Sequence, residues 1–144
     1  MATLCQNAPA PRTARARQAR DFANLTLWTL QGWIAMFFVA AGYAKLTEPS
    51  DNLALLLRWP EQVGLSLVRG VGVLEILLAL GMLMPLFSWR IGRWPLLVSA
   101  AALVVLEIVM LGVHIAGADI SLAVTNLVLL AITIPVLLGR RPSC

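Results

Sequence analysis

The sequence predicts an all-α protein, a four-helix transmembrane bundle whose N and C termini are both cytoplasmic. Of its 144 residues, 60% are hydrophobic and only 12% are charged, whereas soluble domains are about half apolar and about a quarter charged. Four apolar runs each have the ~20 residues that a helix needs to cross ~30 Å of hydrocarbon. Arginines gather in every second connecting segment, as they do in cytoplasmic loops.

The four helices are predicted at about residues 25–45, 65–84, 94–116 and 120–138, and together they form one membrane domain over residues 25–139. Backbone groups in lipid must find their partners within the segment, so each run is helical. The first loop contains a further short helix at about residues 51–59, before Pro60. We expect it to lie in the membrane interface. It either packs over the helix ends or serves as a gate or partner surface.

Charge fixes the predicted orientation. Residues 1–24 form a basic, disordered cytoplasmic tail, and residues 140–144 form a second basic tail. The arginines of the tails and of the second loop are Arg12, Arg15, Arg17, Arg20, Arg90, Arg93, Arg140 and Arg141. The opposite side carries mostly acidic residues, namely Glu48, Asp51, Glu61 and Asp119, with Arg58. This asymmetry predicts that both termini lie in the cytoplasm. The expected location is the bacterial cytoplasmic membrane, as a multi-pass protein.

Tryptophans mark the edges of the predicted spans. Trp28, Trp89 and Trp94 lie at the inner edge, and Trp59 lies at the outer edge, where interfacial aromatic residues are enriched. The net charge of +4 comes from residues that flank apolar runs. The predicted partner is therefore the lipid bilayer, and no nucleic-acid partner is predicted.

Two glutamates stand within the predicted spans. Glu75 lies about ten residues, or ~15 Å, from the outer end of the second helix, and Glu107 lies at a similar depth in the third. A charged group at the bilayer centre costs ~2.5–3.5 kcal/mol on insertion scales. Lys45 and Arg69 are basic residues at the outer ends of their helices and can neutralise Glu75. His114 follows Glu107 by two helical turns, on the same face.

The candidate catalytic residues are Glu75, Lys45, His114 and Glu107. The candidate cofactor-binding residues are Arg69, Gly42, Gly72 and Asn126. We expect Gly42, Gly70, Gly72 and Gly112 to permit close helix approach beside the polar groups. The alternative interpretation is a buried polar network that only holds the helices in register.

Several chemistries are not supported by the sequence. A di-iron bundle requires paired Glu-x-x-His sequences, whereas this chain has a single histidine, which also rules out two axial haem histidines from one chain. No metal site is predicted. Cys5 and Cys144 stand at the two ends of the chain, and their placement indicates no disulfide framework.

The segments GYAKL at residues 42–46 and GVLE at residues 72–75 resemble the signatures of the DoxX-like family of four-helix membrane proteins. The resemblance covers roughly residues 26–138. It implies that Lys45 and Glu75 are the signature polar pair and that His114 is the histidine found late in helix three. Glu107 matches no motif of the family. The family takes its name from a subunit of a thiosulfate:quinone oxidoreductase, and other members resemble partners of redox enzymes.

The resulting hypothesis is a subunit or partner of a quinone-linked or thiol/sulfur redox system, with a proton-handling polar cluster in the outer half of the bundle. Quinone is the candidate cofactor, and a membrane redox enzyme or complex is the candidate partner. A homo-oligomer is also left open. The alternatives are a non-enzymatic accessory or assembly subunit and a small transporter.

Overall fold

The computed structural model describes residues 13–57 and 64–141. Its elements are α1 (Ala14–Thr47), α2 (Ser50–Leu57), α3 (Leu65–Leu83), a 3-10 turn η2 (Met84–Leu86), α4 (Trp89–Ala116) and α5 (Ile120–Gly139). The described residues contain no strand. Four segments are long and apolar enough to cross a membrane: α1, α3 with η2, α4 and α5. The predicted all-helical class and the four spans are therefore confirmed.

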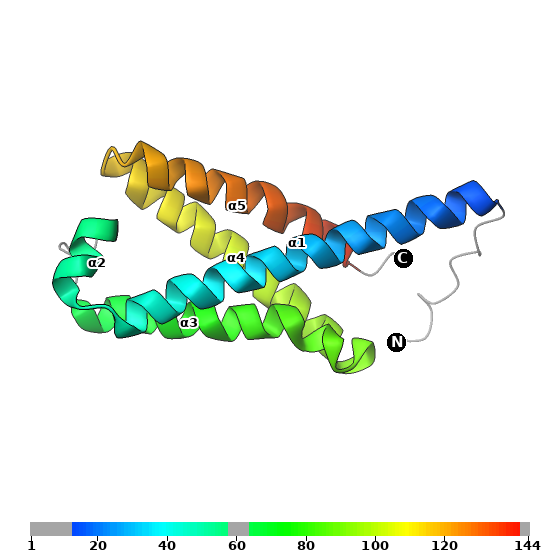
Figure 1. The fold of residues 1–144 in the computed structure, drawn as a ribbon, viewed down its shortest axis with the longest axis horizontal. Helices are drawn as coiled ribbons and strands as arrows, with labels where there is room; N and C mark the ends of the chain where they lie inside the picture. The colour runs from blue at the N-terminus through cyan, green and yellow to red at the C-terminus, as the bar shows by residue number, and fades with distance from the viewer. Residues whose placement is uncertain (1–12, 58–63, 142–144) are drawn as a thin grey trace.

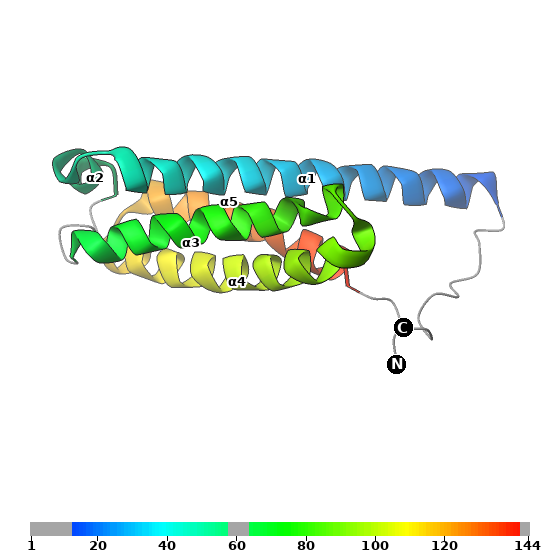
Figure 2. The ribbon, with the colours of Figure 1, turned by 90° about the horizontal axis from the view of Figure 1, so that it is seen from below.

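The four long helices form a ring of neighbours. Helix α1 packs against α3, α3 against α4, α4 against α5, and α5 back against α1. Consecutive long helices run in opposite directions (Figures 1 and 2). As a result, the start of α1 and the end of α5 lie at one end of the bundle, together with the η2 turn. Helix α2 and the α4–α5 turn lie at the other end.

Helix α1 begins earlier than predicted. The expectation of a disordered tail up to residue 24 is wrong from Ala14 onward, because α1 runs continuously from there through the first span. Thr13 caps this start by accepting a hydrogen bond from the Ala16 backbone N–H at 3.3 Å, and the alanine- and arginine-rich stretch that follows has high helix propensity. The extension protrudes beyond the other helices (Figure 2). Residues 1–12 lie outside the described residues.

Helix α4 also begins earlier, at Trp89 rather than residue 94. Proline is tolerated poorly in a helix interior because it removes one backbone hydrogen bond, yet Pro95 lies inside α4. In a membrane bundle, neighbouring helices and local adjustments compensate for such a loss. The preceding turn packs closely onto α4, because a side chain at Gly92 would collide with the backbone of Met84 and Pro85.

Helix α2 packs over the end of α3. Leu53 and Val68 are buried against each other, with Met110 of α4 packed beside them. The observed helix ends at Leu57, and the remainder of the predicted interfacial helix, with Trp59, lies outside the described residues. Packing over the helix ends is therefore part of its role.

The bundle has two unlike halves. The closed half, next to η2, is filled by a continuous apolar core that includes Ile34, Ala35, Ala79, Met82, Leu96, Ala100, Leu103 and Val136. The cavity half, next to α2 and the α4–α5 turn, contains the buried polar residues Lys45, Glu75, Glu107 and His114. The candidate site lies in this second half.

Candidate functional site

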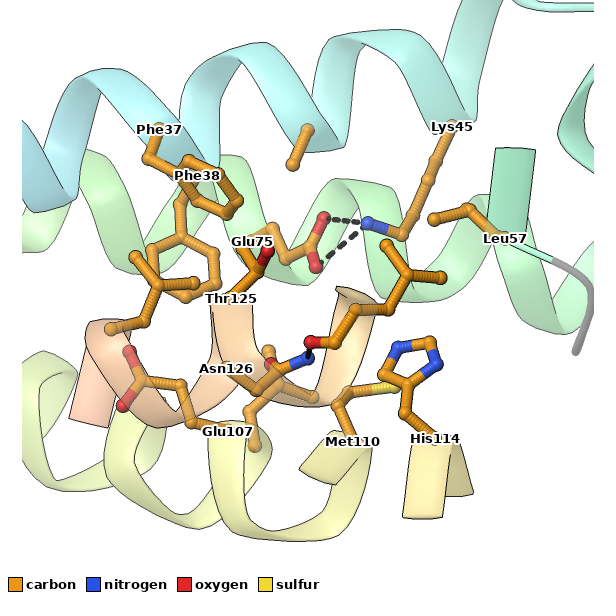
Figure 3. Close-up of a pocket in the computed structure, with 14 residues that line it drawn as sticks. Phe37, Phe38, Lys45, Leu57, Glu75, Glu107, Met110, His114, Thr125 and Asn126 are labelled. Atoms are coloured by element: carbon orange, nitrogen blue, oxygen red, sulfur yellow. Dashed lines mark hydrogen bonds and ion pairs between the residues drawn. The ribbon is translucent and has the colours of Figure 1, made fainter. Parts of the chain in front are cut away.

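Lys45 and Glu75 form a buried ion pair between α1 and α3. The Lys45 Nζ lies 2.9 Å from Oε1 and 2.8 Å from Oε2 of Glu75, and both side chains are at least nine-tenths buried. Figure 3 shows the ammonium group approaching both carboxylate oxygens. Removing two charges from water is costly, and close contact between them offsets much of this cost. The structure thus brings these two predicted residues together.

Arg69 is placed differently from the sequence expectation. Its guanidinium donates to the backbone carbonyls of Lys45 at 2.7 Å and Glu48 at 2.9 Å, and the structure shows no bond from it to Glu75. Lys45 belongs to the last turn of α1 and Glu48 is its C-cap residue, and the final carbonyls of a helix have no partner within it. Arg69 therefore caps α1 and supports Lys45 through its backbone.

Gly42 and Gly72 allow α1 and α3 to meet beside the ion pair. A Cβ atom at Gly42 would lie 2.5 Å from the Gly72 carbonyl oxygen, and one at Gly72 would lie 2.9 Å from the Cβ of Lys45. Neither distance is sterically acceptable, so both positions require glycine. Their geometry is that of helix packing. The expectation that Gly70 and Gly112 also permit close helix approach was wrong, because a Cβ at either position would meet nothing within 4 Å.

Glu107 is held by a threonine from the facing helix. Thr133 Oγ1 lies 2.8 Å from Glu107 Oε1 and also 2.8 Å from the Leu129 carbonyl oxygen of its own helix. Glu107 Oε2 is buried without a hydrogen-bond partner. No ion pair to Glu107 is present among the described residues, so its charged form lacks a balancing cation. The sequence placed Thr133 on a polar face but gave no sign that it contacts Glu107.

His114 and Asn126 complete the polar groups of this region. His114 is only 4% exposed, and its Nδ1 is buried without a hydrogen-bond partner. The turn after it fixes the end of α4, because the Asp119 N–H donates to the His114 carbonyl at 2.9 Å. Asn126 Nδ2 donates to the Leu122 carbonyl of its own helix at 2.9 Å. His114 and Glu107 do not bond to each other in the described structure.

These groups surround one cavity. Its polar lining residues are Lys45, Glu75, Glu107, His114, Thr125 and Asn126, and its apolar lining includes Phe37, Phe38, Leu57 and Met110 (Figure 3). Leu57, Phe37 and Thr125 were not predicted as site residues. Their types are common in apolar helices, so the sequence contains no signal that distinguishes them. Through Leu57, helix α2 forms part of the cavity wall.

The size of the cavity limits what it holds. Its volume is about 90 Å³, which is enough for a few water molecules but well below the ~300–1,000 Å³ of typical small-molecule sites. Quinone, the candidate cofactor, therefore does not fit within it. No group of three or more metal-binding side chains occurs among the described residues. The arrangement is suited to holding and moving protons between carboxyl, amine, imidazole and water groups.

A second buried basic group lies in the closed half. The Arg140 guanidinium stacks between Trp28 and Trp89, with its Cζ 4.9 and 5.0 Å from the two ring centroids, and it donates to Asn24 Oδ1 at 2.7 Å. Burial lowers the pKa of Arg140 from its ordinary value, although arginine remains protonated. This cluster ties the end of α5 to α1 and α4. The sequence predicted interfacial tryptophans without indicating that they meet.

A model of the DoxX-like family matches residues 29–136, which is well over half of the chain and includes every polar residue that lines the cavity. The chain belongs to the DoxX-like family. No match to it is found among curated proteins or among solved structures. The matched range begins after Trp28 and ends before Arg140, so it covers the cavity half but not the arginine cluster.

Proposed function

We propose that this DoxX-like protein is the proton-handling membrane subunit of a quinone-linked or thiol/sulfur redox system. One observation carries the proposal: the Lys45–Glu75 pair faces the same cavity as Glu107 and His114, and both of the latter have a buried acid–base atom without a partner. Groups with this arrangement exchange protons with water held between them. Electrons and any quinone belong to the partner enzyme.

The ion pair supplies the exchangeable group. When Glu75 takes up a proton from a protonated cavity water, its carboxylate becomes a neutral acid. The ammonium of Lys45 then gives a proton to a second cavity water, and transfer of the Glu75 proton to the neutral amine restores the ion pair. The pair therefore passes one proton between two waters and keeps no added charge in the membrane interior, where an isolated charge is costly.

Respiration driven through the partner enzyme tests the proposal. Membranes from a host that lacks the chain are complemented with the wild type, Glu75→Gln, Glu107→Gln or Glu48→Gln. The last is the matched control, because Glu48 contacts Asn52 outside the cavity. We expect quinone-linked oxygen consumption to fall by about 10²–10⁴-fold in Glu75→Gln, as for loss of a general acid–base group, and to stay unchanged in Glu48→Gln. Unchanged consumption in both Glu75→Gln and Glu107→Gln contradicts the proposal.

A second candidate is an accessory subunit that stabilises a larger membrane complex. The exposed start of α1 favours it, because Arg15, Arg17 and Arg20 are exposed along a helix that extends beyond the bundle. This role predicts that deletion of the chain removes the partner complex, whereas Glu75→Gln leaves both the complex and its activity intact. Affinity purification of the partner from the same membranes separates the two functions.

We further propose that the arginine-rich end of the bundle faces the cytoplasm of a bacterial cell, because basic residues accumulate on that side. The native Cys5 and Cys144 allow a direct test with a membrane-impermeant maleimide. Labelling only after the cells are permeabilised is the expected result. Labelling of intact cells would show that the arginine-rich end faces outward, which contradicts the proposed orientation.

A further inference from the structure

A second hollow adjoins the cavity on the lipid-facing side of the bundle. It is a groove between the last turns of α4 and the first turns of α5, and its lining includes Leu111, His114, Ile115, Ala123, Val124 and Leu127. We call it the α4/α5 groove. Its volume is about 380 Å³, within the ~300–1,000 Å³ typical of small-molecule sites. The groove is therefore large enough for a ligand that the cavity cannot hold.

Among the residues that the structure describes, His114 alone lines both the groove and the cavity. It is also the one ionisable residue in the described lining of the groove, whose other members are apolar. The ring is more than nine-tenths buried, and its Nδ1 has no hydrogen-bond partner. A buried polar atom usually has a partner. A single polar group between an apolar groove and a polar cavity defines where the head of an amphiphilic molecule binds.

The walls of the groove indicate the class of that molecule. Ile115, Val124 and Leu127 are each more than half exposed and belong to helices that can cross a membrane, so the groove opens toward lipid. A water-soluble ligand gains nothing from such walls, whereas an apolar ring or chain is favoured by them. A polar end on such a molecule would be placed next to His114, the polar group of the groove.

We propose that the α4/α5 groove binds a lipid-soluble molecule with a hydroxyl-bearing head, and that His114 connects this head to the proton-handling cavity. The inference rests on the proposed function and names the class of ligand that exchanges protons with the cavity. The hydroxyl donates its proton to one nitrogen of the neutral imidazole and keeps the electron pair as an oxyanion, while the opposite nitrogen releases a proton to a cavity water. The imidazole returns to its neutral form as the other tautomer, the proton passes to Glu107 or Glu75, and the reverse sequence returns a proton to the oxyanion.

Photolabelling in lipid nanodiscs tests this site. The probe is a long-chain alkylphenol with a diazirine in its chain, and the control probe is the matching alkylbenzene, which lacks only the hydroxyl. We expect the phenol to label peptides of the groove about tenfold more than the alkylbenzene, the size of one hydrogen bond to a buried group. Equal labelling by the two probes overturns the proposal, because it describes ordinary contact with lipid.

Matched variants locate the label. Ala123→Phe fills the groove, whereas Val128→Phe adds the same side chain to the exposed surface of α5, outside the groove lining. Labelling by the phenol falls about tenfold in Ala123→Phe and stays unchanged in Val128→Phe. His114→Leu removes the preference for phenol over alkylbenzene, and His114→Gln, which keeps a hydrogen-bonding group, retains part of it. An unchanged preference in folded His114→Leu contradicts the assignment.

The outcome of the photolabelling experiment does not depend on the outcome of the respiration test. If the groove shows no preference for the phenol while Glu75→Gln still abolishes respiration, the lipid-side site is wrong and the proton-handling function stands. If the preference is present but Glu75→Gln has no effect, the groove binds its ligand for another purpose and the link to the cavity is wrong.

Discussion

The closed half and the cavity half of the bundle bury polar groups in opposite ways. In the closed half, Gln31 donates to the Met82 carbonyl and Arg140 is enclosed by tryptophans, with apolar side chains filling the remaining space. In the cavity half, the buried polar residues surround a space of about 90 Å³. Protein interiors contain few voids larger than a water molecule. Packing thus dominates the closed half, whereas the cavity half keeps space open beside ionisable groups.

The largest expected effect comes from separating the two charges of the cavity half. Lys45→Met leaves the Glu75 carboxylate buried without its cation, and we expect the free energy of unfolding to fall by about 3–5 kcal/mol. The double variant Lys45→Met/Glu75→Gln recovers much of this loss, because no unpaired charge remains. Unfolding in mixed micelles measures both. If the double variant is no more stable than the single one, the ion pair is not the cause.

A packing substitution in the closed half tests the other side of the comparison. Leu96 is fully buried, and Leu96→Ala is expected to lower the free energy of unfolding by about 2–5 kcal/mol through loss of contacts and formation of a cavity. Met110→Ala is expected to cost less, because Met110 already borders an open space. The same unfolding assay compares the two variants. An equal cost would mean that the cavity half is packed as tightly as the closed half.

The contact between α1 and α3 sharpens the comparison at a single residue. Gly42→Ala introduces a Cβ against the backbone of α3, and we expect it to destabilise the protein by about 1–3 kcal/mol. Gly32→Ala is the matched control in the same helix, since its Cβ meets nothing within 4 Å. There the higher helix propensity of alanine stabilises by up to about 1 kcal/mol. Effects of the same sign at both positions would contradict the close approach.

The smallest expected effect concerns the arginine cluster of the closed half. Arg140→Met keeps an apolar stem but removes the cation between Trp28 and Trp89, and we expect a loss of about 1–2 kcal/mol in the free energy of unfolding. Arg141→Met removes the same charge from an exposed neighbour and is expected to change stability by less than about 0.5 kcal/mol. Thermal denaturation of the two variants side by side gives the difference. Equal stability of both variants would show that the stacking contributes nothing.

Much of the fold followed from the sequence, and the errors have physical causes. The spans were found because lipid requires long apolar helices. The start of α1 was missed because apolar content ends near residue 25, whereas helix propensity and the Thr13 cap continue the helix back to Ala14. The start of α4 was missed because Arg90 and Arg93 were assigned to the second loop, although both lie within the helix.

The contacts among the candidate site residues were predicted only in part. Lys45 and Glu75 were paired correctly, because each stands at a fixed depth on neighbouring helices. Arg69 was placed on the wrong partner, because its long side chain turns to the end of α1. The prediction that glycines permit close helix approach was confirmed for Gly42 and Gly72 and was wrong for Gly70. Spacing along one helix shows which residues share a face, but not which face meets a neighbour.

The sequence by itself determined that this is a four-helix membrane protein and that polar residues lie within its spans. It also indicated that Lys45 can neutralise Glu75. Only the tertiary structure decided that Glu107 meets Thr133, that a cavity separates the polar groups, and that His114 borders a second groove. The reason is that hydropathy fixes the depth of each residue in the membrane. The rotation of each helix about its axis, which decides what each side chain touches, is set by contacts between helices.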